Sequence, residues 1–419
     1  MNITRRYFLK SSGALALYCG FSPAGLLAGT VSTAGSVNKG KTLVVIFLRG
    51  GMDGLNFIVP YADSSYKDLR KSLRLAEPGQ PDGVLNLDGF FGLHPRAAAL
   101  RPLFAEGQAR ALHAVGYDLN TRSHFEEQDT WETGVTGNTV SSDGWLNRHL
   151  VTSSGHGPVR AVSIGDNLPR ILRGKAPAFA LHGIADLNLP GLSKGDDVAM
   201  RSALEHAYCT PLPEHRSAAQ DLLSETAQTT IDGIDIIKKA AGTGYQPGAT
   251  YPKNEISRRL SEAARLIKSN IGIEVIEIDY GGWDTHQNQG GITGAYGNLV
   301  QNLADGLAAF HKDMGEGMKD TLLLTISDFG RTAAENGTGG TDHGWANCML
   351  ALGALSSKAP QPVISKWPGL AKEQLHQGRD LLHTTDFRDV LGEVVGDHLG
   401  NTALKTVLPN HDFQPVGLV

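Results

Sequence analysis

Short apolar runs that end at glycine or at a polar residue are the feature that most constrains how this chain can fold. The first is TLVVIFLRGG, in which residues 42–48 form a near-continuous apolar run and two glycines follow. A run without polar alternation is typical of a strand that is buried on both faces. Similar runs are ARALHAVGY, VRAVSIG, IEVIEIDYGG and TLLLTIS, and NCMLALGA is a candidate for one more.

Segments with helical spacing of apolar residues lie between these runs. In SHFEEQDTWETG, Ser123 is placed to cap a helix and Glu126 stands at its third helical position. The last predicted helix, in TTDFRDVLGEVVGDHL, has Thr384 or Thr385 as its cap. The other predicted helices are HPRAAALRPLFAEGQ, RRLSEAARLIKSN and AYGNLVQNLADGLAAFHKDM. Alternating strands and helices predict the α/β class, with one mostly parallel sheet and helices on both of its faces.

Length, charge and cysteine content narrow the choice of domains and partners. A chain of 419 residues suits one large α/β domain or two smaller ones. The formal charge is −5 and basic residues occur only in short pairs, which argues against nucleic acid as a partner. The three cysteines offer neither a disulfide framework nor a CxxC metal motif.

The first residues resemble a twin-arginine (Tat) export signal. TRRYFLKSSGALALYCGFSPAGLLAG has paired arginines, a modest apolar stretch and then small residues. Its apolar part is too short and too rich in glycine for a stable membrane span. We expect cleavage after Ala28 or Ala34, export to the periplasm by the Tat machinery, and a mature domain over residues 41–419. An amphipathic N-terminal helix is the alternative, and a polar, mostly helical insertion is expected at about 186–248.

Polar residues that can bind metal follow several of the predicted strands. They are Asp53 after the first strand, Asp118, Ser123 and His124 after the second, Asp284 and His286 after EVIEIDY, and Asp328, Arg331, Asp342 and His343 after TLLLTIS. In a parallel sheet, ligands bind at the carboxyl ends of the strands. We therefore expect these side chains to converge at one edge of the sheet.

Each of these residues also has an ordinary structural interpretation. Asp53 could hold a tight turn, and Ser123 could be only a helix cap, although a helix N-terminus also favours a bound anion. Asp284 and His286 lie two residues apart, which places both side chains on one side of extended backbone, but they could be a surface polar pair. Asp328 could cap a helix. Residues 328–330 read Asp-Phe-Gly, as in kinases, but the other kinase motifs do not accompany them.

The residue types predict a metal-dependent site. Carboxylates and imidazoles suit a divalent ion such as Zn²⁺, Mn²⁺, Mg²⁺ or Ca²⁺, which polarises a phosphoryl or sulfuryl oxygen. His343 is a candidate ligand that Asp342 could support. A serine hydroxyl beside such an ion, at a helix N-terminus, would be an activated nucleophile. Arg122, His124 and Arg331 are candidates for contact with an anionic ester substrate.

Several sequence blocks together resemble the DUF1501 family, which is grouped with the alkaline phosphatase superfamily. The blocks are LRGGMDGLN, TRSHFEEQ, GGWDTHQNQ, SDFGRT with GTDHGW, and TTDFRDVL, and they span nearly the whole mature chain. The resemblance implies an alkaline phosphatase-like three-layer sandwich that holds one or two metal ions.

Carried over residue by residue, the resemblance gives each position an expected role. It implies Asp53, Asp284, His286 and His343 as metal ligands, and Ser123 as the nucleophile with Thr121 as second choice. Asp328 matches the aspartate of an Asp-His pair for a second ion, but Phe329 stands where the histidine would be. Either one ion binds, or Asp342 substitutes.

Three functions follow from these expectations. The first is an exported metal-dependent hydrolase of phosphate or sulfate esters. The second is a non-catalytic exported binding or assembly protein that keeps the fold. A phosphoryl-transfer or mutase enzyme is the third, which export disfavours. CTPLP at Cys209 lacks the arginine that a formylglycine sulfatase motif requires.

Overall fold

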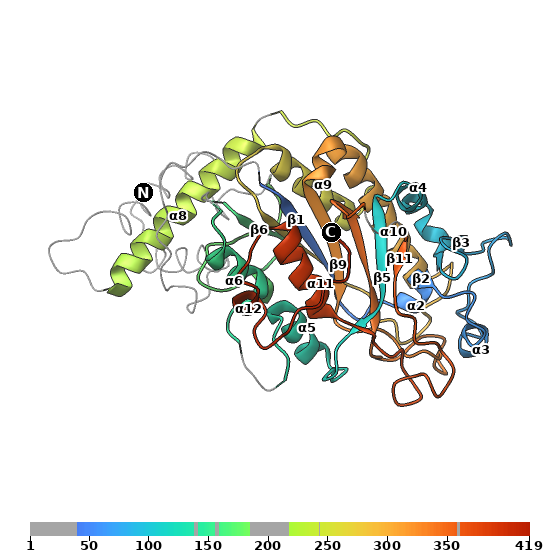
Figure 1. The fold of residues 1–419 in the computed structure, drawn as a ribbon. Coiled ribbons are helices and arrows are strands. Elements are labelled where there is room, and N and C mark those ends of the chain that lie inside the picture. The colour runs from blue at the N-terminus through green and yellow to red at the C-terminus, as the bar shows by residue number, and fades with distance from the viewer. Residues whose placement is uncertain (1–39, 138–140, 156–158, 185–217, 243, 358–360) are drawn as a thin grey trace.

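A large mixed sheet forms the centre of the molecule (Figure 1). The structure is a computed structural model that describes residues 40–137, 141–155, 159–184, 218–242, 244–357 and 361–419. Within these residues the sheet has nine strands in the order β11-β5-β10-β9-β1-β8-β6-β7, with β12 paired to β5. The strands are β1 (Thr42–Leu48), β5 (Ala109–Gly116), β6 (Ala161–Ile164), β7 (Phe179–Leu181), β8 (Val275–Tyr280), β9 (Thr321–Ser327), β10 (Asn347–Gly353), β11 (Val363–Ile364) and β12 (Thr385–Asp386).

The sheet is mostly parallel, as the sequence predicts. β1 lies at its centre, pairs in parallel with β8 and β9, and is buried along its whole length. Among the described strands, β10 runs antiparallel to both of its neighbours, β9 and β5. The residues before β10, rather than those after it, therefore lie at the carboxyl edge of the parallel strands.

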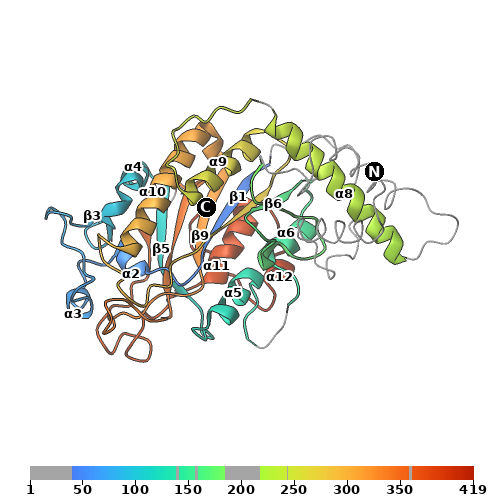
Figure 2. The ribbon, with the colours of Figure 1, turned by 180° about the vertical axis from the view of Figure 1, so that it is seen from behind.

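Helices cover both faces of the sheet, as Figures 1 and 2 show from opposite sides. Alternate residues of β1 contact different helices, because successive side chains of a strand point to opposite faces. Val44, Ile46 and Leu48 belong to the core with α4 (Arg101–Ala105), α9 (Glu255–Lys268) and α10 (Ala295–Met314). Leu43, Val45 and Phe47 belong to the core with α5 (His124–Thr133), α6 (Trp145–Thr152), α11 (Phe387–Glu393) and α12 (Leu404–Val407).

The remaining described elements are short, apart from α8 (Ala218–Ala241), whose neighbour is α9. A small antiparallel sheet has the order β2-β4-β3. Its strands and the short helices are β2 (Ile58–Val59), β3 (Leu85–Asn86), β4 (Gly92–Leu93), α2 (Gly54–Phe57), α3 (Tyr66–Leu69), 3₁₀ helices at Pro95–Leu100, Arg170–Leu172 and Gly315–Lys319, and a π-helix at Val394–His398.

Two predicted helix boundaries differ from the structure. The helix predicted over 94–108 is a 3₁₀ helix followed by α4. The cap of α11 is Asp386, whose carboxylate accepts from the backbone N–H of Arg388, instead of Thr384 or Thr385. The predicted leader and part of the expected insertion, residues 185–217, lie outside the described residues. None of the described helices combines the length and the apolar character that a membrane crossing needs.

Candidate metal centre

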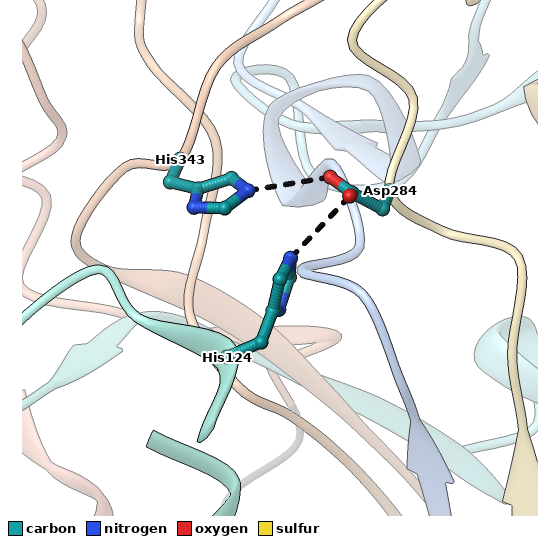
Figure 3. Close-up of side chains that lie close together, drawn as sticks. All are labelled: His124, Asp284 and His343. Carbon is teal, nitrogen blue, oxygen red and sulfur yellow. Dashed lines mark hydrogen bonds and ion pairs between the residues drawn. The ribbon is translucent and has the colours of Figure 1, made fainter. Parts of the chain in front are cut away.

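Three side chains from separate parts of the chain meet at the carboxyl edge of the sheet (Figure 3). Asp284 lies in the loop after β8, His124 is the first residue of α5, and His343 lies in the loop before β10. One ligand atom from each falls within 4.8 Å of the others. His343 Nε2 is 3.3 Å from one Asp284 oxygen, and His124 Nε2 is 3.6 Å from the other.

His286 brings a third imidazole to the same place. Its Nε2 lies 3.0 Å from Asp284 Oδ1 and 2.9 Å from His343 Nε2. Two ring nitrogens at that separation must share a proton or a cation, because two lone pairs facing each other repel. The four side chains are called the histidine–aspartate cluster: His124, Asp284, His286 and His343.

The outer nitrogen of each imidazole has a hydrogen-bond acceptor. His124 Nδ1 lies 2.7 Å from Asp328 Oδ2, and His286 Nδ1 lies 3.0 Å from Asp342 Oδ1. His343 Nδ1 donates to the backbone carbonyl of Arg122 at 2.8 Å. Acceptors at Nδ1 favour the tautomer whose Nε2 lone pair is free to bind a metal. In that tautomer all three Nε2 atoms, which face Asp284, would be free to bind a cation placed between them and the carboxylate.

The electrostatics of the cluster agree with a carboxylate that remains ionised. Burial opposes ionisation of Asp284, but the hydrogen bond and charge of Arg331, with the nearby imidazoles, hold the pKa of Asp284 below its usual value. Burial lowers the pKa of His343, although its bond to the Arg122 carbonyl opposes the shift. The bond to Asp328 raises the pKa of His124, and burial opposes it.

The residues fit a divalent metal ion. His124 Nε2 is buried without a hydrogen-bond partner, which is costly for a polar atom unless something else binds it. Imidazole nitrogens with one carboxylate form a donor set for Zn²⁺ and similar borderline ions. Among the described residues, one group of three or more candidate ligands comes this close together, and it is the one in this cluster.

Asp328 supports the cluster from behind. Its Oδ1 accepts from the backbone N–H groups of Gly50 and Gly51, and its Oδ2 accepts from His124 and from Gln128 Nε2. The first loop can approach this closely because Gly50 has φ +115°, and a Cβ there would lie 2.6 Å from the backbone N of Asp284. The structure therefore places Asp328 beside the His124 imidazole and outside the group of three candidate ligands.

Arg331 is also fully buried beneath the cluster. Its guanidinium donates to the carbonyls of Gly51, Thr341 and Trp283 and, at 2.6 Å, to Asp284 Oδ1. It therefore ties together three loops at the carboxyl edge and holds the Asp284 carboxylate. The sequence predicts contact with substrate for Arg331; the structure shows its buried guanidinium bonded to loop carbonyls and to Asp284.

Asp53 has different partners from the cluster. Its carboxylate forms a fully buried ion pair with Arg70, at 2.5 and 3.0 Å, and accepts from Gln289 Nε2 at 2.6 Å. The structure therefore brings Asp53 to Arg70 rather than to the histidines. The sequence places no strong signal on Arg70, because it follows a helix of only four residues.

Ser123 stands at the N-cap of α5, next to the ligand candidate His124. The sequence predicts the cap position, but the hydroxyl makes no capping hydrogen bond. Thr121, the second candidate nucleophile, donates its hydroxyl to Glu127 at 2.9 Å. The Thr121 hydroxyl is therefore engaged with Glu127, whereas the Ser123 hydroxyl does not cap the helix.

Arg122 lies between Ser123 and the segment before β12. Its guanidinium bonds Asp380 Oδ2 at 2.9 Å and Gln377 Oε1 at 2.9 Å. Its backbone has φ +60°, uncommon for a residue with a side chain, and its carbonyl accepts from His343. The backbone carbonyl of Arg122 thus orients His343, and its side chain forms an ion pair with Asp380.

A family model described as "Protein of unknown function (DUF1501)" matches residues 104–409. The chain belongs to this family. A comparison with curated proteins finds no match to the sequence. The match confirms the resemblance that the sequence blocks indicate, and it includes His124, Asp284, His286 and His343.

Solved structures similar to this DUF1501 protein include phosphatases and sulfatases. Alkaline phosphatase from the Antarctic bacterium TAB5 has 12% identity, with a TM-score of 0.30 and coverage of 75% of this chain and 92% of that one. The PsFucS1 sulfatase from Pseudoalteromonas sp. has 13% identity, a TM-score of 0.30 and coverage of 75% and 62%. Ps i-CgsB, bound to k-i-k-neocarrahexaose, has 11% identity, a TM-score of 0.36 and coverage of 86% and 72%.

The sequence predicts a different role for one residue of this candidate site, His124, and does not single out another, Gln128. His124 is expected to contact substrate, but its Nε2 faces Asp284 with the other imidazoles. Gln128, one helical turn after His124, is not singled out, although the i, i+4 spacing puts both on one face of α5. Gln128 bridges Asp328 and Arg49, whose Nη1 it accepts at 3.1 Å.

Proposed function

We propose that this protein is a metal-dependent hydrolase of phosphate or sulfate esters that uses Ser123 as its nucleophile. The observation that carries the proposal is the convergence of three imidazole Nε2 atoms on the Asp284 carboxylate, with a serine at the N-cap of the helix that begins at His124. His124, Asp284, His286 and His343 would hold the ion. A divalent ion bound there would polarise an ester oxygen and lower the pKa of a nearby hydroxyl or water.

The protein's own groups supply binding and the nucleophile. Backbone N–H groups at the start of α5, a helix of ten residues, attract the negative charge of a phosphate or sulfate group. The Ser123 oxygen would form a bond to phosphorus or sulfur while the bond to the alcohol breaks. Water would then cleave the seryl ester and restore the hydroxyl.

The first experiment measures metal content and turnover on the same protein. The mature chain is purified, its zinc and manganese are quantified, and hydrolysis of p-nitrophenyl phosphate, its diester and p-nitrophenyl sulfate is followed. Ser123→Ala is expected to reduce kcat by about 10³-fold or more with unchanged metal content. Thr121→Val is the matched control and should keep turnover within about threefold of wild type. No metal and no turnover on any of the three esters would refute the proposal.

A non-catalytic binding role is the second candidate, and His286 is the observation that favours it. If all four side chains of the cluster bind one tetrahedral ion, the site is closed, as structural zinc sites are. His286→Ala would then destabilise the protein without opening any activity. For a hydrolase, the metal-loaded wild type should instead bind vanadate or phosphate, which needs an open position.

We also propose export by the Tat pathway to the periplasm, which rests on the leader residues TRRYFLK. Replacing Arg5 and Arg6 by lysine in the full chain should retain the protein in the cytoplasm. Periplasmic recovery equal to that of wild type would contradict this proposal.

A further inference from the structure

Exposed large apolar side chains are few and unevenly placed in the described part of the chain. They are Leu119, Phe125, Val151 and Leu382, with exposed fractions of 57%, 91%, 51% and 36%. Single exposed apolar residues are common on protein surfaces, so their number alone indicates little. Their positions are informative, because all but Val151 lie on segments that build or border the histidine–aspartate cluster.

Phe125 is the most exposed of them. It is the second residue of α5, directly after the ligand candidate His124 and two residues after the proposed nucleophile, Ser123. His124 itself turns inward to Asp284 and Asp328. The adjacent aromatic ring therefore stands in solvent within the first turn of the helix that carries the chemistry.

Leu119 and Leu382 lie on two segments that run next to each other. Their neighbours Asp118 and His383 approach within 3.4 Å, between a carboxylate oxygen and Nε2. The Arg122–Asp380 ion pair, at 2.7 Å, joins the same two segments. The β5–α5 loop and the segment before β12 thus lie side by side and form one rim, and the loop leads through Arg122 and Ser123 to His124 at the start of α5.

We infer that the ester substrate carries an apolar alkyl or aryl group, which Phe125 contacts and which the rim with Leu119 and Leu382 accommodates. The inference rests on the proposed function. Ligand sites combine apolar walls with a few convergent polar groups, and binding energy from a remote apolar group can serve the reaction at the polar end. The loop that carries Leu119 runs directly into the helix that carries His124 and Phe125, and this favours a substrate group over a separate docking partner.

Binding of non-hydrolysable phosphonates tests the inference without relying on turnover. Affinities of methyl-, butyl- and hexylphosphonate for the zinc-loaded protein are measured by calorimetry. Affinity should rise by about tenfold from methyl to hexyl, since partial burial of a few methylenes supplies that much. In Phe125→Ser the rise should fall to about threefold or less, with unchanged zinc content.

Val151→Ser is the matched control. Val151 is also an exposed apolar residue near the surface end of a helix, but it precedes Thr152, which lines a pocket with Lys41 and Glu274 at the opposite, amino edge of the sheet. This variant should keep the full dependence on chain length.

The possible outcomes separate the inference from the proposed function. If no phosphonate binds, methylphosphonate included, the inference fails and so does the phosphate-ester form of the proposed function. Methylphosphonate binding with a flat chain-length series overturns the inference alone, as does a wild-type series in Phe125→Ser. If Phe125→Ser weakens binding to phospholipid vesicles and leaves the phosphonate series unchanged, the ring serves a membrane surface and the inference is wrong.

Discussion

Asp328→Asn should weaken metal binding by about 10- to 100-fold while leaving all four residues of the histidine–aspartate cluster unchanged in the sequence. Asp328 accepts four hydrogen bonds, from Gly50 N at 2.9 Å, Gly51 N at 3.2 Å, His124 Nδ1 at 2.7 Å and Gln128 Nε2 at 2.8 Å. Asparagine has one acceptor oxygen, so its amide NH₂ must face one of these two donor pairs. Either the glycine loop or His124 loses its acceptor.

The magnitude follows from the role of the carboxylate. Removing the group that fixes a ligand imidazole typically costs about 10- to 100-fold in metal affinity, or about 1.4–2.7 kcal/mol. Zinc affinity is measured by competition with a fluorescent chelator, and folding is followed by circular dichroism. A zinc affinity of the folded variant within about threefold of wild type would refute the assignment of Asp328 as the group that positions His124.

Asp313→Asn is the matched control for this experiment. Asp313 is also buried and also accepts several hydrogen bonds, from Gly248 N at 2.6 Å, Tyr251 at 2.8 Å, Tyr245 and Lys268. It lies at the end of α10, and none of these partners belongs to the cluster. Its substitution should lower Tm without changing the zinc affinity of the folded protein.

Three further substitutions test the buried charges. Burial is the main cause, and the charge of Asp279 the second, that raises the pKa of Glu277 well above 4.5. Above pH 4.5 the unfolded chain releases a proton that the folded state keeps. The free energy of unfolding therefore falls as the pH rises past 4.5. Glu277→Gln should therefore raise Tm at pH 8 and lose this advantage below pH 4; parallel Tm–pH curves would contradict the assignment. Asp53→Asn leaves Arg70 buried without its partner and should cost about 3–5 kcal/mol in urea unfolding, with the zinc content per folded molecule unchanged. If the folded variant lacks zinc, Asp53 is a ligand. Arg331→Lys keeps the charge but not the planar guanidinium and should lower both Tm and zinc affinity; an effect on kcat alone would support direct contact with substrate.

The local sequence is sufficient to predict most of the sheet. The run at residues 42–48 is predicted as a strand buried on both faces, and β1 occupies those residues in the middle of the sheet. Such a prediction succeeds because an unbroken apolar run can be buried only where helices cover both faces. The direction of β10 cannot be predicted in this way, since parallel and antiparallel neighbours bury the same side chains.

The roles of the polar residues at the sheet edge are harder to predict. Asp284 and His343 are expected near each other because both adjoin strands, and the structure brings them together. Whether Asp53 joins them depends on Arg70, a partner 17 positions away that no local pattern connects to it. The partner of a buried carboxylate is the cation or hydrogen-bond donor that the tertiary structure brings next to it, which for Asp53 is Arg70.

The sequence by itself determined the α/β class, the buried strands and the loops on which the polar side chains stand, because periodicity and turn chemistry act over a few neighbouring residues. Only the tertiary structure decided which of those side chains turn their Nε2 atoms toward Asp284 and which lie behind it. Hydrogen-bond partners such as the Arg122 carbonyl, Asp328 and Asp342 fix the tautomer and direction of each imidazole. They come from segments that meet only when the sheet has formed.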